Sequence, residues 1–200
     1  MPQADPNSNN HAAGEIKWDA VAAIIASLVG LLALAVAAYT AYIQRYTAQL
    51  QKEQVEAEVW PYLEPSVDMG AKQPYGIVIT NKGVGPAIVR SVQVDIDGKP
   101  VTSWNAVNRL MGFNPTSGYV NSFLNHNVLS PGERLGWITF NDAADARAFE
   151  SDLSKFHSKV VVCYSSTLGE SWVMDVTRGR MSRHAVSACP VVPASKQFSN

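Results

Sequence analysis

The chain has 200 residues, which suits one ordinary domain with an appendage and is too short for two sizeable cores. Its 16 basic and 17 acidic residues nearly cancel, so it lacks the basic excess typical of nucleic-acid-binding proteins. Its two cysteines exclude a disulfide-dense mini-protein and a four-cysteine zinc site.

One long block near the N-terminus, from Ala20 to Ile43, contains no charged residue. A membrane-spanning helix needs about 20 apolar residues. Aromatic residues of the kind found at membrane–water interfaces stand at its ends: Trp18, Tyr39, Tyr42 and Tyr46. We therefore predict a disordered tail over 1–17 and a transmembrane helix over 18–43. A cleaved signal peptide is the alternative, but the residues before the block lack the positive charge of such peptides.

Basic residues flank this block unequally. Only Lys17 precedes it, whereas Arg45 and Lys52 follow it closely. Positively charged residues near a span tend to stay in the cytoplasm. The charge count therefore predicts a cytoplasmic C-terminal domain rather than a periplasmic one.

Small residues recur at every fourth position in two rows along the predicted helix. The first row is Ala22, Ala26 and Gly30, and the second is Ala33, Ala37 and Ala41. Such rows let two helix backbones approach closely in a membrane. They predict a homo-oligomer formed through this helix, although an alanine-rich span also shows such rows by chance.

Residues 44–60 are rich in helix-forming residues and contain no glycine. They predict a helical stalk that continues from the span. Pro61 ends it, because the residue before a proline avoids the α region.

Beyond Pro61 the sequence changes to short β-type runs separated by turn signals. The predicted strands cover 62–67, 75–80, 88–96, 99–103, 134–140, 159–166 and 171–176. In 88–96, alternation places Ile88, Arg90 and Val92 on one face and Val89 and Ser91 on the other. Asp97-Gly98 is a strong signal for a tight turn between two strands.

The stretch 142–156 predicts an amphipathic helix capped by Asn141 or Asp142, and 104–111 predicts one helical turn or two. The glycine- and asparagine-rich stretch 112–127 predicts a loop, and the residues after 177 predict a loosely ordered tail. Because loops on rigid scaffolds often carry function, we assign a candidate contact loop to three aromatic residues: Phe113, Tyr119 and Phe123.

The predicted elements describe a mainly β protein. About seven short strands with turns between them favour an antiparallel, immunoglobulin-like β-sandwich over 61–177, with one or two short helices. Most of the aromatic residues are expected in its core: Trp104, Trp137, Phe140, Tyr164 and Trp172.

Three segments together resemble a known group. They are Val59-Trp60-Pro61-Tyr62-Leu63 after the stalk, Asn81-Lys-Gly-Val-Gly-Pro-Ala87, and Val162-Cys-Tyr-Ser-Ser-Thr-Leu-Gly-Glu-Ser-Trp172. With the apolar span, this combination is similar to uncharacterised bacterial single-pass membrane proteins with a C-terminal immunoglobulin-like β-sandwich domain. The resemblance covers roughly 18–176 and implies a location in the bacterial inner membrane. It implies no activity.

Motifs of known chemistry are absent from the sequence. Gly83-Val84-Gly85 leads into Pro86 and a strand, whereas a dinucleotide fingerprint leads into a helix. We predict no catalytic, cofactor-binding or metal-binding residue. Cys163 is expected to be a small core residue and Cys189 a free cysteine, with a bond between them as the alternative if the domain is extracytoplasmic.

From these observations we predict a membrane-anchored, non-enzymatic binding or interaction module with an unknown protein partner and no nucleic-acid partner. The alternative is a signalling effector in which a ligand-sensing sandwich controls the assembly of the transmembrane helix. The alternative requires a ligand pocket, and the first hypothesis requires a flat protein-binding face.

Overall fold

In the computed structural model, residues 18–68 and 75–199 are described. The chain divides into two compact units with the boundary between Lys52 and Glu53. The predicted tail over 1–17 lies outside the described residues. Because the boundary falls inside the predicted stalk, the last residues of the stalk belong to the same unit as the strands.

Helix α1 (Trp18–Glu58) is continuous over 41 residues. It includes the predicted span and nearly all of the predicted stalk. It is about 60 Å long at roughly 1.5 Å per residue. None of its residues is buried within the chain, and its length and composition are sufficient to cross a membrane.

The described part of the second unit holds ten strands. They are β1 (Leu63–Asp68), β2 (Tyr75–Asn81), β3 (Ala87–Ile96), β4 (Lys99–Val101), β5 (Tyr119–Asn121), β6 (Val128–Leu129), β7 (Arg134–Phe140), β8 (Ser158–Ser165), β9 (Ser171–Thr177) and β10 (Arg180–Val186). All seven strands expected from the sequence form, each with bounds close to the predicted ones.

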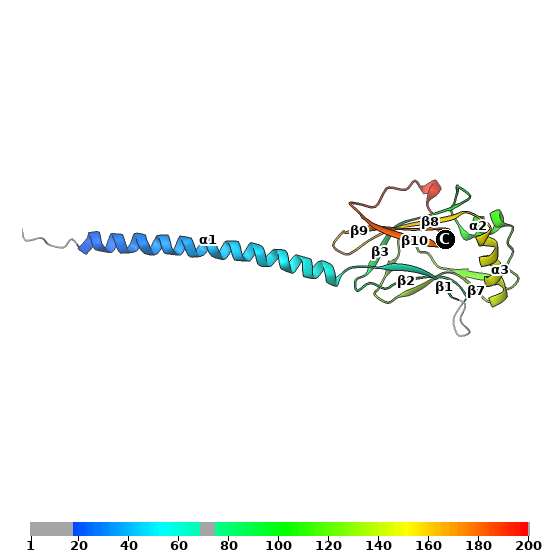
Figure 1. Cartoon of the computed structure of the whole chain (residues 1–200), viewed down its shortest axis with the longest axis horizontal. Helices are drawn as coiled ribbons and strands as arrows, with labels where there is room; N and C mark the ends of the chain where they lie inside the picture. Colours follow the sequence, from blue (N-terminus) through cyan, green and yellow to red (C-terminus); the bar gives the residue numbers. More distant parts are fainter. Residues whose placement is uncertain (1–17, 69–74, 200) are drawn as a thin grey trace, which may run out of the picture. The chain divides into compact units, whose positions relative to one another are not determined.

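These strands build two antiparallel sheets that face each other (Figure 1). One sheet has the order β1-β2-β7-β5. The other has the order β10-β9-β8-β3-β4, with β6 paired to β3. A sandwich-like arrangement of antiparallel sheets is therefore confirmed, while the immunoglobulin-like assignment is more specific and stays a prediction.

Two helices, α2 (Trp104–Met111) and α3 (Ala143–Ser154), lie at one end of the sheets (Figure 1). Each begins where a side chain accepts a backbone hydrogen bond of the first turn. Ser103 Oγ accepts from Ala106 N at 3.3 Å, and Asp142 Oδ1 accepts from Ala144 N at 2.9 Å. These N-caps satisfy donors that have no partner inside the helix, and both predicted helices are confirmed.

The core between the sheets is centred on an aromatic cluster. Trp104 and Trp137 lie 4.8 Å apart between ring centroids, and Phe198 lies 5.1 Å from the first and 5.3 Å from the second. All three contacts are edge-to-face, a geometry that aromatic pairs favour. The cluster thus joins α2, β7 and the C-terminal segment.

Strand β3 departs from the predicted alternation at Arg90. Its pairing with β8 runs through Val89 opposite Tyr164 and then Ser91 opposite Cys163, so Arg90 is an extra residue at a β-bulge. Because a bulge shifts the two-residue period, Val89 and Val92 are both buried in the core. The prediction that Ile88 and Val92 share one face was therefore wrong.

The C-terminal residues are more ordered than the sequence predicts. Strand β10 pairs with β9 along its whole length, and a 3-10 turn covers Ala194–Lys196. Phe198 is only 1% exposed, and its backbone N–H donates to Val92 O at 2.8 Å. The expected loose tail over 178–200 is thus replaced, through 199, by a strand and a segment anchored in the core. The prediction rested on the basic residues of this stretch and overlooked Phe198, the core residue near its end.

Candidate functional site

The segment Asn81–Pro86 forms a joint at which the chain leaving α1 meets the sheets. Asn81 is fully buried. Its Oδ1 accepts from Tyr62 N at 3.1 Å and from Gly83 N at 3.0 Å, and its Nδ2 donates to Gly85 O at 2.8 Å and to Leu129 O at 2.9 Å. One side chain therefore satisfies four backbone groups from three separate segments.

The two glycines of this joint permit a close backbone approach. A Cβ atom on Gly83 would lie 2.3 Å from Trp60 O, and one on Gly85 would lie 2.0 Å from Val59 O. Trp60 O also accepts hydrogen bonds from the backbone of Val84 at 3.0 Å and of Gly85 at 3.2 Å. The glycines of the segment therefore have a packing role, because a side chain on either would meet the backbone of Val59 or Trp60.

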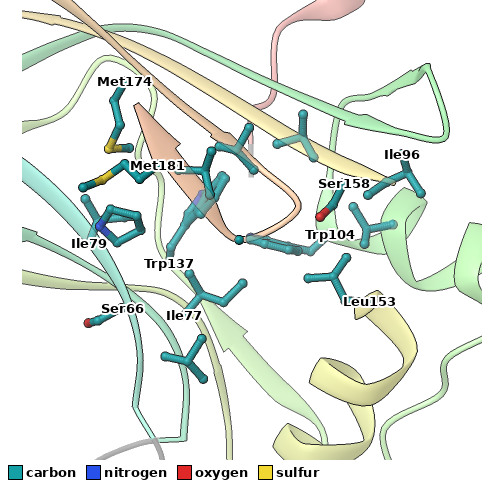
Figure 2. A pocket seen from close by; sticks show the side chains of 17 residues that line it. Ser66, Ile77, Ile79, Ile96, Trp104, Trp137, Leu153, Ser158, Met174 and Met181 are labelled. Carbon is teal, nitrogen blue, oxygen red and sulfur yellow. The ribbon is translucent and has the colours of Figure 1, made fainter. Parts of the chain in front are cut away.

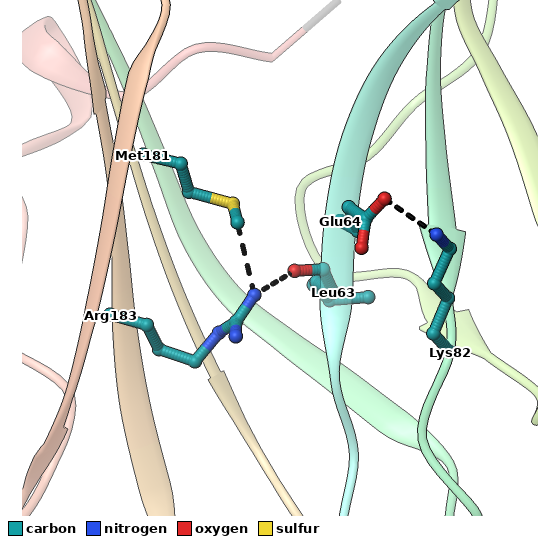
Figure 3. A network of polar contacts seen from close by, with 5 residues as sticks. All are labelled: Leu63, Glu64, Lys82, Met181 and Arg183. Carbon is teal, nitrogen blue, oxygen red and sulfur yellow. Dashed lines mark hydrogen bonds and ion pairs between the residues drawn. The ribbon is translucent and has the colours of Figure 1, made fainter.

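Arg183 on β10 links the two sheets at their edges (Figure 3). Its guanidinium donates to Leu63 O and lies 3.5 Å from the centre of the Tyr62 ring, so it contributes a charge-assisted hydrogen bond and a cation–π contact. Nearby, burial raises the pKa of the Tyr164 hydroxyl. This link closes the gap between β10 and β1 near the first residue of β1.

Farther along the same two strands, a cavity of about 290 Å³ opens between the sheets. Its inner wall contains buried apolar side chains from both sheets, including Ile79, Trp137 and Met174 (Figure 2). Its entrance lies at Val67 on β1 and Met181 on β10, which are 50% and 41% exposed. The cavity is therefore a pocket reached from the edge of the sandwich.

The pocket is almost purely apolar. Of the described residues, 17 line it and none of these carries a charge. Ser66 and Ser158 contribute the only side-chain hydroxyls of this lining. A ligand that matches such walls is uncharged and mainly hydrocarbon, because a buried charge without a partner is costly.

The indole N–H groups of Trp104 and Trp137 have no hydrogen-bond acceptor among the described residues. Both atoms are covered by neighbouring atoms rather than exposed in the pocket. Both rings pack edge-to-face within the aromatic cluster. These two donors therefore belong to the core and do not select a ligand.

The three residues of the predicted contact loop differ in how exposed they are. Phe113 is buried against Phe140 and Phe149, and Tyr119 is half-buried with its hydroxyl donating to Asn105 Oδ1 at 2.7 Å. Only Phe123 is largely exposed, at 61%. The assignment of Phe113 to a contact surface was wrong, because the loop folds back onto the core.

Asp145 holds this loop against α3. Its carboxylate accepts hydrogen bonds from Ser117 Oγ at 2.6 Å and Ser117 N at 2.8 Å, and from Thr116 N at 3.1 Å and Thr116 Oγ1 at 3.0 Å. Donation by Ser117, and secondarily by Thr116, lowers the carboxyl pKa from 3.8 to about 2. The perturbed pKa thus has a structural cause.

The small residues singled out in the span all lie on α1. They are Ala22, Ala26, Gly30, Ala33 and Ala37, all exposed within the chain. Self-association through them stays a prediction.

The cysteines are joined by a disulfide between Cys163 on β8 and Cys189. This is the pairing that the sequence left open. Within residues 18–68 and 75–199, no group of three or more histidine, cysteine, aspartate or glutamate side chains is arranged to hold a metal ion. The sequence did not predict the pocket, because the aromatic residues that line it were expected to be core residues.

Comparison with known proteins gives one family. No curated protein and no solved structure matches the chain. Residues 19–179 match the family described as a domain of unknown function, DUF8453, and the matched residues include most of α1 and every described strand except β10. The chain therefore belongs to the DUF8453 family.

Proposed function

We propose that this protein is a membrane-anchored, non-enzymatic binding module whose sandwich takes a small uncharged apolar ligand in the pocket between its sheets. The uncharged pocket of about 290 Å³ carries the proposal. Pockets for small molecules are concave, mainly apolar and about 300–1,000 Å³ in volume. The pocket also favours the ligand-sensing role over a flat protein-binding face.

The cost of leaving the pocket empty supports a ligand. Apolar cavities cost roughly 24 cal/mol per Å³, so 290 Å³ corresponds to about 7 kcal/mol if closed and dry. The open entrance makes this an upper limit. Even so, this free energy is comparable to the whole stability of a typical domain, about 5–15 kcal/mol.

The size of the pocket bounds the ligand. A cavity of about 150 Å³ holds benzene, so this pocket has room for about 12 carbon atoms. Naphthalene is therefore a suitable probe.

The test is thermal unfolding of the full-length chain in lipid nanodiscs, followed by near-ultraviolet circular dichroism with and without naphthalene. We expect naphthalene to raise the melting temperature of the native chain. Val160→Trp fills the pocket and abolishes the rise, whereas Val120→Trp, on an exposed strand position outside the pocket, preserves it. An equal rise in both variants, or no rise in the native chain, contradicts the proposal. Val160→Phe replaces Val160→Trp if the latter does not fold.

We propose further that α1 anchors the chain in a membrane and that the sheets lie in an oxidising compartment, outside the cytoplasm. The family match begins within the first turn of α1, which favours a retained helix over a cleaved signal peptide. Disulfides persist in oxidising compartments, so the Cys163–Cys189 bond argues against the cytoplasmic side favoured by the charge count.

A Ser151→Cys variant tests the side of the membrane, because Ser151 is exposed on α3. We expect a membrane-impermeant thiol reagent to label this residue in intact spheroplasts. Labelling only after lysis would place the sheets in the cytoplasm.

The joint at Asn81 favours the signalling role as a second candidate, because it fastens the residues that follow α1 to two strands of the sandwich. In that role, naphthalene changes the oligomeric state of the full-length chain, measured by chemical crosslinking in nanodiscs. An unchanged oligomer favours a binding module without signalling.

A further inference from the structure

A second hollow, of about 470 Å³, lies between the second sheet and the C-terminal segment. It shares no lining residue with the apolar pocket. Its polar lining side chains are Arg90, His126, Ser165, Ser171, Ser187 and Gln197, together with Ser91. Pro190, Val191 and Val192 also line it, so its lining is mixed and more polar than that of the pocket.

Arg90 is directed to this hollow by the bulge of β3. The bulge leaves Arg90 without a partner residue in β8, and bulges characteristically redirect a side chain. Arg90 Nε donates to Ser165 Oγ at 3.0 Å. In the described part of the chain, its two terminal nitrogens have no partner, so a fork of donors remains free.

The charge balance of the hollow favours an anion. Arg90 is its only fixed charge, and no aspartate or glutamate is among the described residues that line it. Glu170 is adjacent in sequence to two lining residues, Gly169 and Ser171, but does not line it. The Ser91 and Ser187 hydroxyls and the His126 imidazole also line the hollow.

Covalent and hydrogen-bonded contacts fix the walls. Cys189 lines the hollow and forms a disulfide with Cys163 on β8. Ser165, which also lines the hollow, lies two residues after Cys163 on the same strand. The Gln197 amide donates to Asn125 Oδ1 at 3.2 Å, and Phe198, next in the chain, is buried in the core. A site held in this way loses little conformational freedom when a ligand binds.

We propose that this hollow is a binding site for a tetrahedral oxyanion, the phosphate or sulfate group of a small polar ligand. The Arg90 guanidinium binds two oxygens side by side, since its planar fork matches oxyanion geometry. Serine hydroxyls donate to the remaining oxygens. Ser165 is a positioning residue that holds the guanidinium through Nε.

Isothermal titration of the full-length chain in a non-ionic detergent with inorganic phosphate, and separately with sulfate, tests this site. Chloride at equal ionic strength is the baseline. We expect saturable binding of at least one oxyanion. Arg90→Gln should weaken it by about tenfold or more, as expected for the loss of hydrogen bonds to a charged group.

Arg147→Gln is the matched control, because Arg147 is exposed on α3 and does not line the hollow. It removes the same charge and should leave the affinity unchanged. Arg90→Lys keeps the charge without the fork and should bind with intermediate affinity, and it also serves if Arg90→Gln does not fold. Absence of saturable binding by both anions, or equal weakening in the Arg90 and Arg147 variants, overturns the proposal.

Discussion

Replacing Asn81 by alanine removes the side chain at the centre of the joint. Four hydrogen bonds are lost, and three of them are buried: those to Gly83 N, Gly85 O and Leu129 O. Each hydrogen bond contributes about 1 kcal/mol net, so the free energy of unfolding should fall by about 4 kcal/mol. For a domain of this size, that loss lowers the melting temperature by roughly 8–16 °C.

The measurement is urea and thermal unfolding of the full-length chain, followed by near-ultraviolet circular dichroism, since α1 dominates the far-ultraviolet signal. Asn121→Ala is the control, because Asn121 is half-buried on β5 and its side chain makes no hydrogen bond within the described residues. Asn81→Asp should destabilise at least as much as alanine, because it keeps the acceptor but places carboxylate oxygen near two carbonyls. A loss below about 1 kcal/mol for Asn81→Ala would refute the assigned role of the joint.

Three further changes have defined outcomes. Asp145 has a carboxyl pKa lowered from 3.8 to about 2, so its stabilising contribution is complete above about pH 5 and is lost as the pH falls to about 1. Asp145→Asn should abolish this part of the pH dependence in acid titrations of unfolding. Phe198→Ala should cost about 3–5 kcal/mol in urea unfolding, and a cost typical of a loose tail, near zero, would contradict the core position. Replacing Cys163 and Cys189 by alanine opens a loop with a sequence separation of 26 and should cost about 3.5 kcal/mol in the same assay, while unchanged stability would argue that the bond is not formed in the purified chain.

Much of the fold follows from local patterns. The long uncharged block predicts α1, and the alternation and turn signals predict the hairpins, including the tight turn at Asp97-Gly98 that joins β3 to β4. These elements are set by the spacing of side chains along the chain, which the sequence states directly. The helix at 143–154 is predictable from its amphipathic pattern and its cap at Asp142, whereas the cap of α2, Ser103, lies in a stretch that the sequence assigns to a strand.

Features that depend on distant residues are not predictable in this way. The pairing of Cys163 with Cys189 requires the C-terminal segment to cross the second sheet, and the burial of Phe198 requires the same path. Neither the disulfide nor the burial of Phe198 can be inferred from the spacing of side chains along a short segment. The apolar pocket is a space that side chains leave unfilled. Residues such as Ile79 and Met174 are equally suited to lining a cavity and to a packed core, so the sequence does not distinguish the two.

The extra residue in β3 has a consequence for relatives of this chain. A bulge is one residue of additional length, so its gain or loss during evolution appears as a one-residue insertion or deletion between Val89 and Ser91. In a relative that lacks one residue here, β3 would pair regularly with β8. The residue at the position of Arg90 would then no longer be directed to the hollow. Chain length at a single point of an alignment would then divide the family into members with and without an anion site.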